Sequence, residues 1–110
     1  MEYFSRLTIG MWRKIKAVDN VNFTPRTGHD CIIVKEKIYL FGGTDDDDRK
    51  NDLHSYDVHM NKWILLPSKG KVPLPRSGAK GVHYENMLYF FGGYQKKSGN
   101  FYKDLFYYDL

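Results

Sequence analysis

The chain has 110 residues, room for one small domain, and 16% of them are aromatic. Its formal net charge is only +4, and the basic residues do not form a stripe interleaved with aromatics, which argues against nucleic-acid binding. No stretch approaches the roughly 20 apolar residues that span a membrane, so the composition indicates a β-rich protein with material for a packed core.

The N-terminal segment, residues 1–24, is the least regular part of the sequence. Residues 1–6 lack the basic-then-apolar build of a secretory signal, so we expect a cytoplasmic protein, with the nucleus as the alternative. Residues 11–15, Met-Trp-Arg-Lys-Ile, predict one β-strand around Trp12 with no strand before it.

Residues 25–74 contain the first complete set of β-rich runs. A two-residue polar turn joins the first two runs as a hairpin, and a pair of glycines and a long polar loop separate the second run from the third. The runs predict four antiparallel strands, at residues 29–34, 37–41, 52–56 and 62–66.

Residues 75–110 repeat this order after a linker rich in glycine and proline. Three runs predict strands at residues 79–84, 87–91 and 104–108, and the sequence has no counterpart of the fourth.

Short motifs recur along the chain with a period near fifty residues. PRTG at 25–28 returns as PRSG at 75–78, and YLFGG at 39–43 returns as YFFGG at 89–93. An Asp-Leu pair at the start of the third strand, Asp52-Leu53 and Asp104-Leu105, recurs 52 residues apart. A period of this length predicts propeller blades, because each unit must stack on its neighbours to bury its apolar faces.

At these residues the sequence resembles the kelch-repeat family. The kelch motif has a glycine pair after the second strand, a tyrosine in the third and a tryptophan opening the fourth. The matching positions are Gly42, Gly43, Tyr56 and Trp63 in the first unit, Gly92, Gly93 and Tyr108 in the second, and Trp12 in the N-terminal segment. The resemblance implies an all-β fold, a kelch-type β-propeller segment of about two four-stranded antiparallel blades.

The implied division is an N-terminal segment with a fourth-type strand (1–24), a first repeat (25–74) and a second repeat lacking its own fourth strand (75–110). A ring needs at least about four blades. The chain is therefore expected to be part of a longer propeller, or a protomer that closes by association, for example a trimer with six blades.

The kelch anchors are expected to build the fold rather than to bind a partner. Glycine at the strand end permits positive φ and close backbone approach. Tyr56 and Trp63 are expected to pack as an aromatic pair between neighbouring blades.

The candidate binding residues lie before the first strand of each unit. Arg26 and Arg76 are expected near the mouth of the central channel, where repeated guanidinium groups would suit the carboxylates of an acidic peptide. The neighbouring hydroxyls of Thr27 and Ser77 would add contacts. The alternative is that each arginine hydrogen-bonds loop carbonyls or a carboxylate of a neighbouring blade.

The loops after the glycine pairs, residues 44–51 and 94–103, are expected on the same face, and their sequences differ. They add Asp45, Asp46 and Tyr94 to the candidates for partner binding. A calcium site is not predicted, because the acidic run lacks alternating ligands and a glycine turn.

Catalysis and cofactors are not expected from this sequence. Copper radical oxidases also use a kelch-type propeller, but the four histidines here are scattered. Cys31 is expected as a small buried hydrophobe within a strand. Nucleophile elbows, zincin spacings and phosphate-binding glycine loops are absent.

The sequence therefore predicts a protein–protein interaction module, a scaffold or adaptor that binds a protein or acidic peptide through its loop face. One alternative is a regulatory kelch portion of a larger enzyme, such as a kelch-bearing protein phosphatase. A second is a self-assembling structural scaffold.

Overall fold

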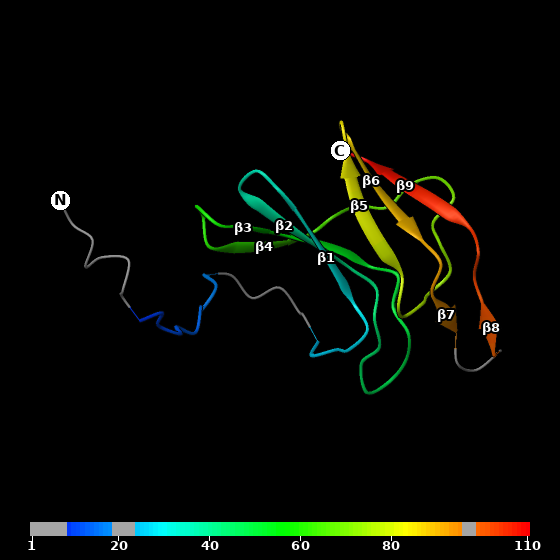
Figure 1. Cartoon of the computed structure of the whole chain (residues 1–110), viewed down its shortest axis with the longest axis horizontal. Coiled ribbons are helices and arrows are strands. Elements are labelled where there is room, and N and C mark those ends of the chain that lie inside the picture. Colours follow the sequence, from blue (N-terminus) through cyan, green and yellow to red (C-terminus); the bar gives the residue numbers. More distant parts are fainter. Residues whose placement is uncertain (1–8, 19–23, 96–98) are drawn as a thin grey trace.

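The chain folds into two antiparallel β-sheets that pack side by side (Figure 1). The computed structural model describes residues 9–18, 24–95 and 99–110, and within these ranges it contains nine strands and no helix. The strand order is β1-β2-β3-β4 in the first sheet and β5-β6-β9 in the second, with a separate ribbon of β7 and β8.

The first sheet, called blade 1, contains β1 (Asp30–Val34), β2 (Lys37–Phe41), β3 (Leu53–Asp57) and β4 (Lys62–Leu65). All neighbours are antiparallel. Each strand lies within one residue of its predicted position.

The second sheet, called blade 2, contains β5 (Lys80–Tyr84), β6 (Met87–Phe91) and β9 (Leu105–Asp109). These three strands were also predicted, so the all-β, blade-by-blade architecture is confirmed.

A two-stranded ribbon lies in what the sequence predicted as a long loop. It pairs β7 (Tyr94–Gln95) with β8 (Asn100–Phe101), and the rings of Tyr94 and Phe101 lie 5.8 Å apart. Its strands have two residues each, too few for a periodicity signal. Residues 96–98, within the same loop, lie outside the described residues.

The second glycine of each pair closes the start of a loop against the segment before β1 or β5. Gly43 and Gly93 have φ of 99° and 97°. A Cβ on Gly43 would lie 2.8 Å from the Thr27 carbonyl oxygen, and one on Gly93 would lie 2.8 Å from the Ser77 carbonyl oxygen. Both positions therefore require glycine for its positive φ and for its missing side chain.

The core lies between the two blades and takes residues from both. Phe41 of blade 1 and Phe90 of blade 2 have ring centroids 4.6 Å apart, and Leu88 is completely buried. The cluster comprises Ile32, Tyr39, Phe41, Leu53, Ala79, Leu88 and Phe90. Side chains alternate along a strand, so the opposite faces of both blades point away from this core.

The predicted N-terminal strand is absent from the structure. Residues 9–17 have no strand conformation, and Trp12 is 99% exposed. The physical reason is the lack of a partner strand, since a single strand cannot form hydrogen bonds between its own backbone N–H and C=O groups. Among its described residues, the segment is tied to blade 1 near position 18, where Val18 N–H donates to the Asn61 carbonyl oxygen and the Asn61 amide donates to the Lys16 carbonyl oxygen.

One further expectation is wrong, and another is confirmed only for the pairing of the two rings. Cys31 is exposed rather than buried, because it lies on the face of β1 that points away from blade 2. Tyr56 and Trp63 face each other with ring centroids 5.2 Å apart. They pack on that same side of blade 1 and not between the two blades of this chain.

Gly81 marks the tightest point of the junction between the blades. A Cβ there would lie 2.6 Å from Ile32 Cδ1 and 2.6 Å from Phe90 Cε1. We expect Gly81→Ala to lower the free energy of unfolding by about 1–3 kcal/mol through overpacking. Chemical denaturation monitored by fluorescence measures this change.

Blade 1 carries a Cys31–Leu40 pair at the position of the Gly81–Phe90 pair of blade 2. Phe90→Leu should therefore relieve part of the clash, and the double variant should be less destabilised than the sum of the two single variants. Strict additivity would contradict this account of the junction.

Candidate functional site

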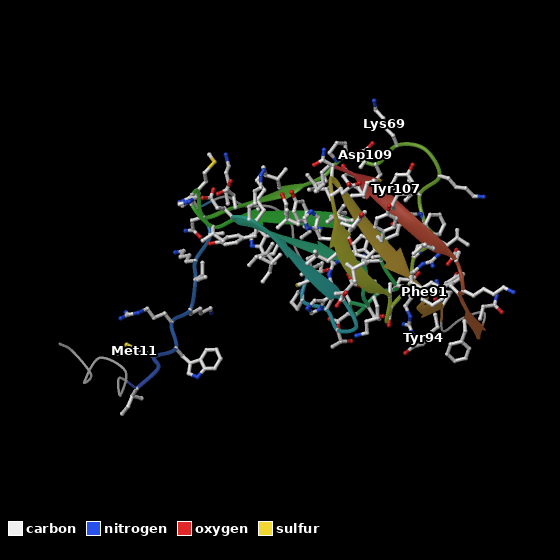
Figure 2. All side chains as sticks on the ribbon, turned by 45° about the horizontal axis from the view of Figure 1, so that its top comes forward. Met11, Lys69, Phe91, Tyr94, Tyr107 and Asp109 are labelled. Carbon is white, nitrogen blue, oxygen red and sulfur yellow. The ribbon has the colours of Figure 1, made fainter. Side chains whose placement is uncertain are left out.

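One end of the two blades, called the loop face, brings the candidate binding segments together. Thr27 and Thr44 exchange both backbone hydrogen bonds, at 2.9 and 2.7 Å. Ser77 and Tyr94 exchange the same pair, at 3.1 and 2.9 Å. The segments before β1 and β5 therefore lie beside the loops that follow the glycine pairs. Figure 2 shows Tyr94 at the opposite end of blade 2 from Asp109.

Arg26 is held inside blade 1 by a fork of hydrogen bonds to a carboxylate. Its Nη1 donates to Asp52 Oδ1 at 2.6 Å and its Nη2 donates to Asp52 Oδ2 at 3.1 Å. Nη1 also donates to the Gly42 carbonyl oxygen at 3.1 Å, and Nε donates to the Thr24 carbonyl oxygen at 3.3 Å. The side chain is only 3% exposed.

Arg76 makes the same arrangement in blade 2. Its Nη1 donates to Asp104 Oδ1 at 2.6 Å and to the Gly92 carbonyl oxygen at 3.2 Å, and its Nε donates to the Leu74 carbonyl oxygen at 2.9 Å. The guanidinium carbon lies 3.9 Å from the ring centroid of Tyr102. This site and its counterpart at Arg26 are called the Arg–Asp clasps.

The clasps overturn the expectation that the two arginines bind an acidic partner. Each guanidinium group is buried and already occupied by a carboxylate and two carbonyl oxygens, so it cannot form an exposed ring of charge. The missed partners are Asp52 and Asp104. Their recurrence before the third strand of each unit was visible in the sequence, but nothing in the spacing paired them with an arginine 26 or 28 residues earlier.

The electrostatics of the clasps favour ionised carboxylates. Burial alone would raise the pKa of Asp52, but hydrogen bonds from His54 and Arg26 outweigh burial and hold that pKa well below its usual range. The Nε2 of His54 lies 2.8 Å from Asp52 Oδ2. In blade 2 the hydrogen bond from Arg76 lowers the pKa of Asp104.

The hydroxyl candidates are placed differently. Ser77 is buried, with 6% of its surface exposed, whereas Thr27 is exposed. The backbones of both residues hold the loops in place, as their bridges to Thr44 and Tyr94 show.

The acidic loop has one structural aspartate and two exposed ones. Asp45 is only 4% exposed; its Oδ1 accepts from the backbone of Asp47 and Asp48, and its Oδ2 lies 3.0 Å from Lys50 Nζ. Asp46 and Asp47 are exposed. Among the residues that the structure describes, no group of three or more His, Cys, Asp and Glu side chains is placed to hold a metal ion.

A hollow lies beside this loop, and two of the residues that line it carry buried polar atoms without a partner among the described residues. Thr44, the four aspartates, Arg49 and Gln95 line it. Within the described ranges, Thr44 Oγ1 and Arg49 Nε are buried and have no hydrogen-bond partner. The guanidinium carbon of Arg49 lies 4.9 Å from the ring centroid of Tyr94, which is 39% exposed at the rim. Sequence patterns gave no signal for this hollow, because it joins two loops of unrelated sequence.

The residues considered for catalysis do not converge. His54 bonds to Asp52, His59 bonds to Glu36 on the surface, and His83 bonds to the Glu85 carbonyl oxygen. Although Cys31 is exposed, partial desolvation of its thiol and the neighbouring Asp30 charge raise the pKa of that thiol, the opposite of what an activated nucleophile needs. No helix in the described part of the chain could cross a membrane.

The family model and the individual relatives that match this chain point to the same family. The model described as the KLHDC2/KLHL20/DRC7 Kelch-repeats domain matches residues 3–110. The chain is 32% identical to the N-(sulfonatooxy)prop-2-enimidothioate sulfolyase of Thlaspi arvense, over 84% of this chain and 28% of that protein.

Two further relatives are the host cell factor homolog hcf-1 of Caenorhabditis elegans and Kelch domain-containing protein 3 of Homo sapiens. The first is 30% identical over 86% of this chain and 12% of its own length. The second is 31% identical over 73% of this chain and 21% of its own length. The chain therefore spans less than a third of each of these three relatives.

The clasps predict a loss of stability when either arginine is removed. Arg26→Ala and Arg76→Ala should each lower the free energy of unfolding by about 1–3 kcal/mol, because carbonyl and carboxylate acceptors lose their donors. The larger effect typical of fully buried ion pairs is not expected, since Asp52 and Asp104 are 28% and 42% exposed and can regain water.

Arg76→Lys should recover little of that stability, because an ammonium group cannot reproduce the fork. Lys103→Ala, an exposed neighbour of the clasp, is the matched control. Urea titrations of the four variants measure the differences, and an Arg76→Ala variant as stable as Lys103→Ala would contradict the structural role.

The same carboxylates predict how stability depends on pH. The folded-state pKa values of Asp52 and Asp104 lie below the unfolded value of about 3.9. Their contribution is therefore complete above about pH 4 and is lost as the pH falls through the folded-state values, because the unfolded chain binds protons first. Asp52→Asn should flatten the fall in stability below about pH 4 in urea titrations across pH, and parallel curves for the variant and the parent would contradict this.

Proposed function

Because this chain belongs to the kelch-repeat family, we propose that it is a protein-interaction module that binds a partner protein through its loop face. The repeated residues hold the blades, whereas the loops at 44–51 and 94–103 differ in sequence and structure. Variable loops on a fixed scaffold are where binding specificity usually lies.

The observation that carries the proposal is the hollow between the acidic loop and β7. Thr44 Oγ1 and Arg49 Nε are buried there without a partner in the described residues. Such atoms are uncommon in folded proteins and destabilise them unless something satisfies them. Both atoms are closed to solvent, so a polar group of a bound protein would satisfy them by opening the hollow as it docks. Tyr94 at the rim supplies the aromatic contact typical of interface centres.

The chemistry of the partner follows from what remains exposed. Arg26 and Arg76 are not proposed as contacts, because the clasps occupy them. Asp46 and Tyr94 remain as candidate contacts, and Asp45 supports the loop from within. An acidic peptide would meet like charge at Asp46, so a partner segment with hydroxyl, amide or basic side chains fits this surface better.

A second candidate is the kelch portion of a larger enzyme. One relative carries an enzyme name, a sulfolyase, and this chain matches 28% of it. The scattered histidines and the raised pKa of Cys31 favour a non-catalytic role for the described residues. A kelch-bearing phosphatase would likewise use this segment for regulation.

The substitution Thr44→Val tests the proposed site by effects of opposite sign. Removing an unpartnered buried hydroxyl should leave stability unchanged or slightly raised, because no hydrogen bond is lost in the free chain. The same change should raise the Kd for the partner by about tenfold, because the hydrogen bond between the Thr44 hydroxyl and an uncharged group of the partner can no longer form. The partner is first identified by a photo-cross-linking residue at Tyr94, and its Kd is then measured by calorimetry.

The matched control is Met60→Ala, which alters a residue 61% exposed in the turn between β3 and β4. It should change neither stability nor affinity. Loss of stability in Thr44→Val with unchanged affinity would mean that the hydroxyl serves the fold, and the proposed site would be wrong.

A further inference from the structure

A single hydroxyl group links the Arg–Asp clasp of blade 1 to the acidic loop, residues 44–51. Thr24 lies two residues before Arg26 and is partly buried. Its Oγ1 accepts a hydrogen bond from Arg26 Nη2 at 3.1 Å and donates one to Asp45 Oδ2 at 2.9 Å. Because a hydroxyl can accept and donate at the same time, Thr24 joins the guanidinium group of the clasp to a carboxylate of the loop.

Asp45 is the residue through which the acidic loop is held. Its Oδ1 accepts hydrogen bonds from the backbone N–H groups of Asp47 and Asp48, at 2.9 and 3.0 Å. Its Oδ2, which accepts from Thr24, also lies 3.0 Å from Lys50 Nζ. Both carboxylate oxygens are therefore engaged within the chain, and the position of Asp45 fixes the turn that follows it.

Lys50 connects the same carboxylate to the clasp of blade 2. The carbonyl oxygen of Lys50 accepts a hydrogen bond from the backbone N–H of Arg76 at 3.0 Å. Its ammonium group and the Thr24 hydroxyl approach the same oxygen of Asp45. The acidic loop is thus connected to Arg26 through side chains and to Arg76 through the backbone.

The second repeat lacks this hydroxyl link at both of its ends. Leu74 stands at the position of Thr24, and Gln95 stands at the position of Asp45, each 50 residues later. Arg76 Nε still donates to the Leu74 carbonyl oxygen at 2.9 Å, as Arg26 Nε does to the Thr24 carbonyl oxygen. A leucine side chain has no group that could continue the network. The backbone contact is therefore common to both blades, whereas the hydroxyl link is specific to blade 1.

The two loops differ in structure in the same way. The acidic loop turns around the Asp45 carboxylate, whereas the loop of blade 2 forms the ribbon of β7 and β8. Asp46, a candidate partner contact, follows Asp45 directly and is exposed. The link through Thr24 therefore sets where this exposed carboxylate lies relative to blade 1.

We propose that Thr24 is a positioning residue that ties the acidic loop to the Arg26 clasp, and that it thereby sets the conformation in which this loop meets the partner protein. The effect on binding rests on the proposed function, whereas the link itself is a property of the free chain. It holds the turn after Asp45 in one position while the hollow beside it opens. A loop that is ordered before docking loses less conformational entropy when the partner binds, so the affinity is higher.

The substitution Thr24→Val tests the link in the free chain, because valine keeps the branched shape and removes the hydroxyl. Hydrogen exchange of the Asp47 and Asp48 amides, measured by NMR, should become about threefold to tenfold faster as the turn opens more often. Hydrogen bonds from the Asp48 backbone, Lys50 and Thr24 hold the pKa of the Asp45 carboxyl below its usual range. Removing the Thr24 hydroxyl should raise that pKa, which an NMR titration measures.

Two variants serve as controls for this measurement. Thr24→Ser restores a hydroxyl and should recover the exchange rates of the parent chain. Leu74→Val makes a change to the same residue type at the equivalent position of the second repeat, and it should leave the Asp47 and Asp48 amides unaltered.

The exchange data also separate a positioning role from a general contribution to stability. In Thr24→Val the amide of Leu40, in the central strand β2, should change less than the two loop amides. Equal acceleration at Leu40 would mean that Thr24 stabilises the whole blade, and it would overturn the proposal. Unchanged exchange at Asp47 and Asp48 together with an unchanged Asp45 pKa would also overturn it.

The effect on binding is measured with the protein captured by the cross-linking residue at position 94. Thr24→Val should raise its Kd by about threefold to tenfold, and Thr24→Ser should restore the parent value. A Kd that is unchanged in Thr24→Val but raised in Thr44→Val would overturn the role of Thr24 in binding. If neither variant changes the Kd while the loop amides of Thr24→Val exchange faster, the link stands and the proposed binding surface is wrong.

Discussion

The Arg–Asp clasp is the interaction on which the rest of the structure depends. It ties the segment before the first strand of a blade to the start of its third strand, and it fixes the carbonyl group that ends the second. The backbone of Arg76 is bonded to blade 1 while its side chain is bonded to blade 2, so one residue sets the position of both sheets. Because the planar guanidinium group donates two hydrogen bonds to one carboxylate, it fixes the orientation of the two joined segments as well as the distance between them.

The loop face owes its chemistry to that arrangement. The buried arginines and the glycine pairs bring loops of unrelated sequence together, and the exposed groups of these segments include Thr27, Asp46, Asp47 and Tyr94. The fold thus separates two tasks. Repeated residues hold the framework, and residues that do not repeat are free to recognise a partner.

Most of the fold could be predicted from the sequence, and much of the site could not. Alternating aromatics and repeated motifs predicted β1 to β6 and β9, because strand formation and blade stacking follow local pattern and period. The expected roles of Arg26 and Arg76 were wrong because a charged side chain before a strand reads as exposed until its carboxylate partner is known. The strand around Trp12 and the burial of Cys31 failed for a different reason: each needs a neighbouring surface that the described residues do not supply. The pairing of β7 with β8 could not be predicted, because strands of two residues are too short to show an alternating pattern.

The junction between the blades is built largely from main-chain atoms near the loop face, where Gly43, Arg76, Lys50, Gly78 and Gly28 meet through their amides and carbonyls. Such contacts do not depend on side-chain identity, and any two units that keep the glycine pair and the Pro-Arg-x-Gly segment present the same connectors. A gene that duplicates, deletes or exchanges one repeat would therefore still encode units that fit together, and only side-chain packing, as at Gly81, would need later adjustment. The architecture is in this sense modular at the level of the genome, so that the number of units can change faster in evolution than the unit itself.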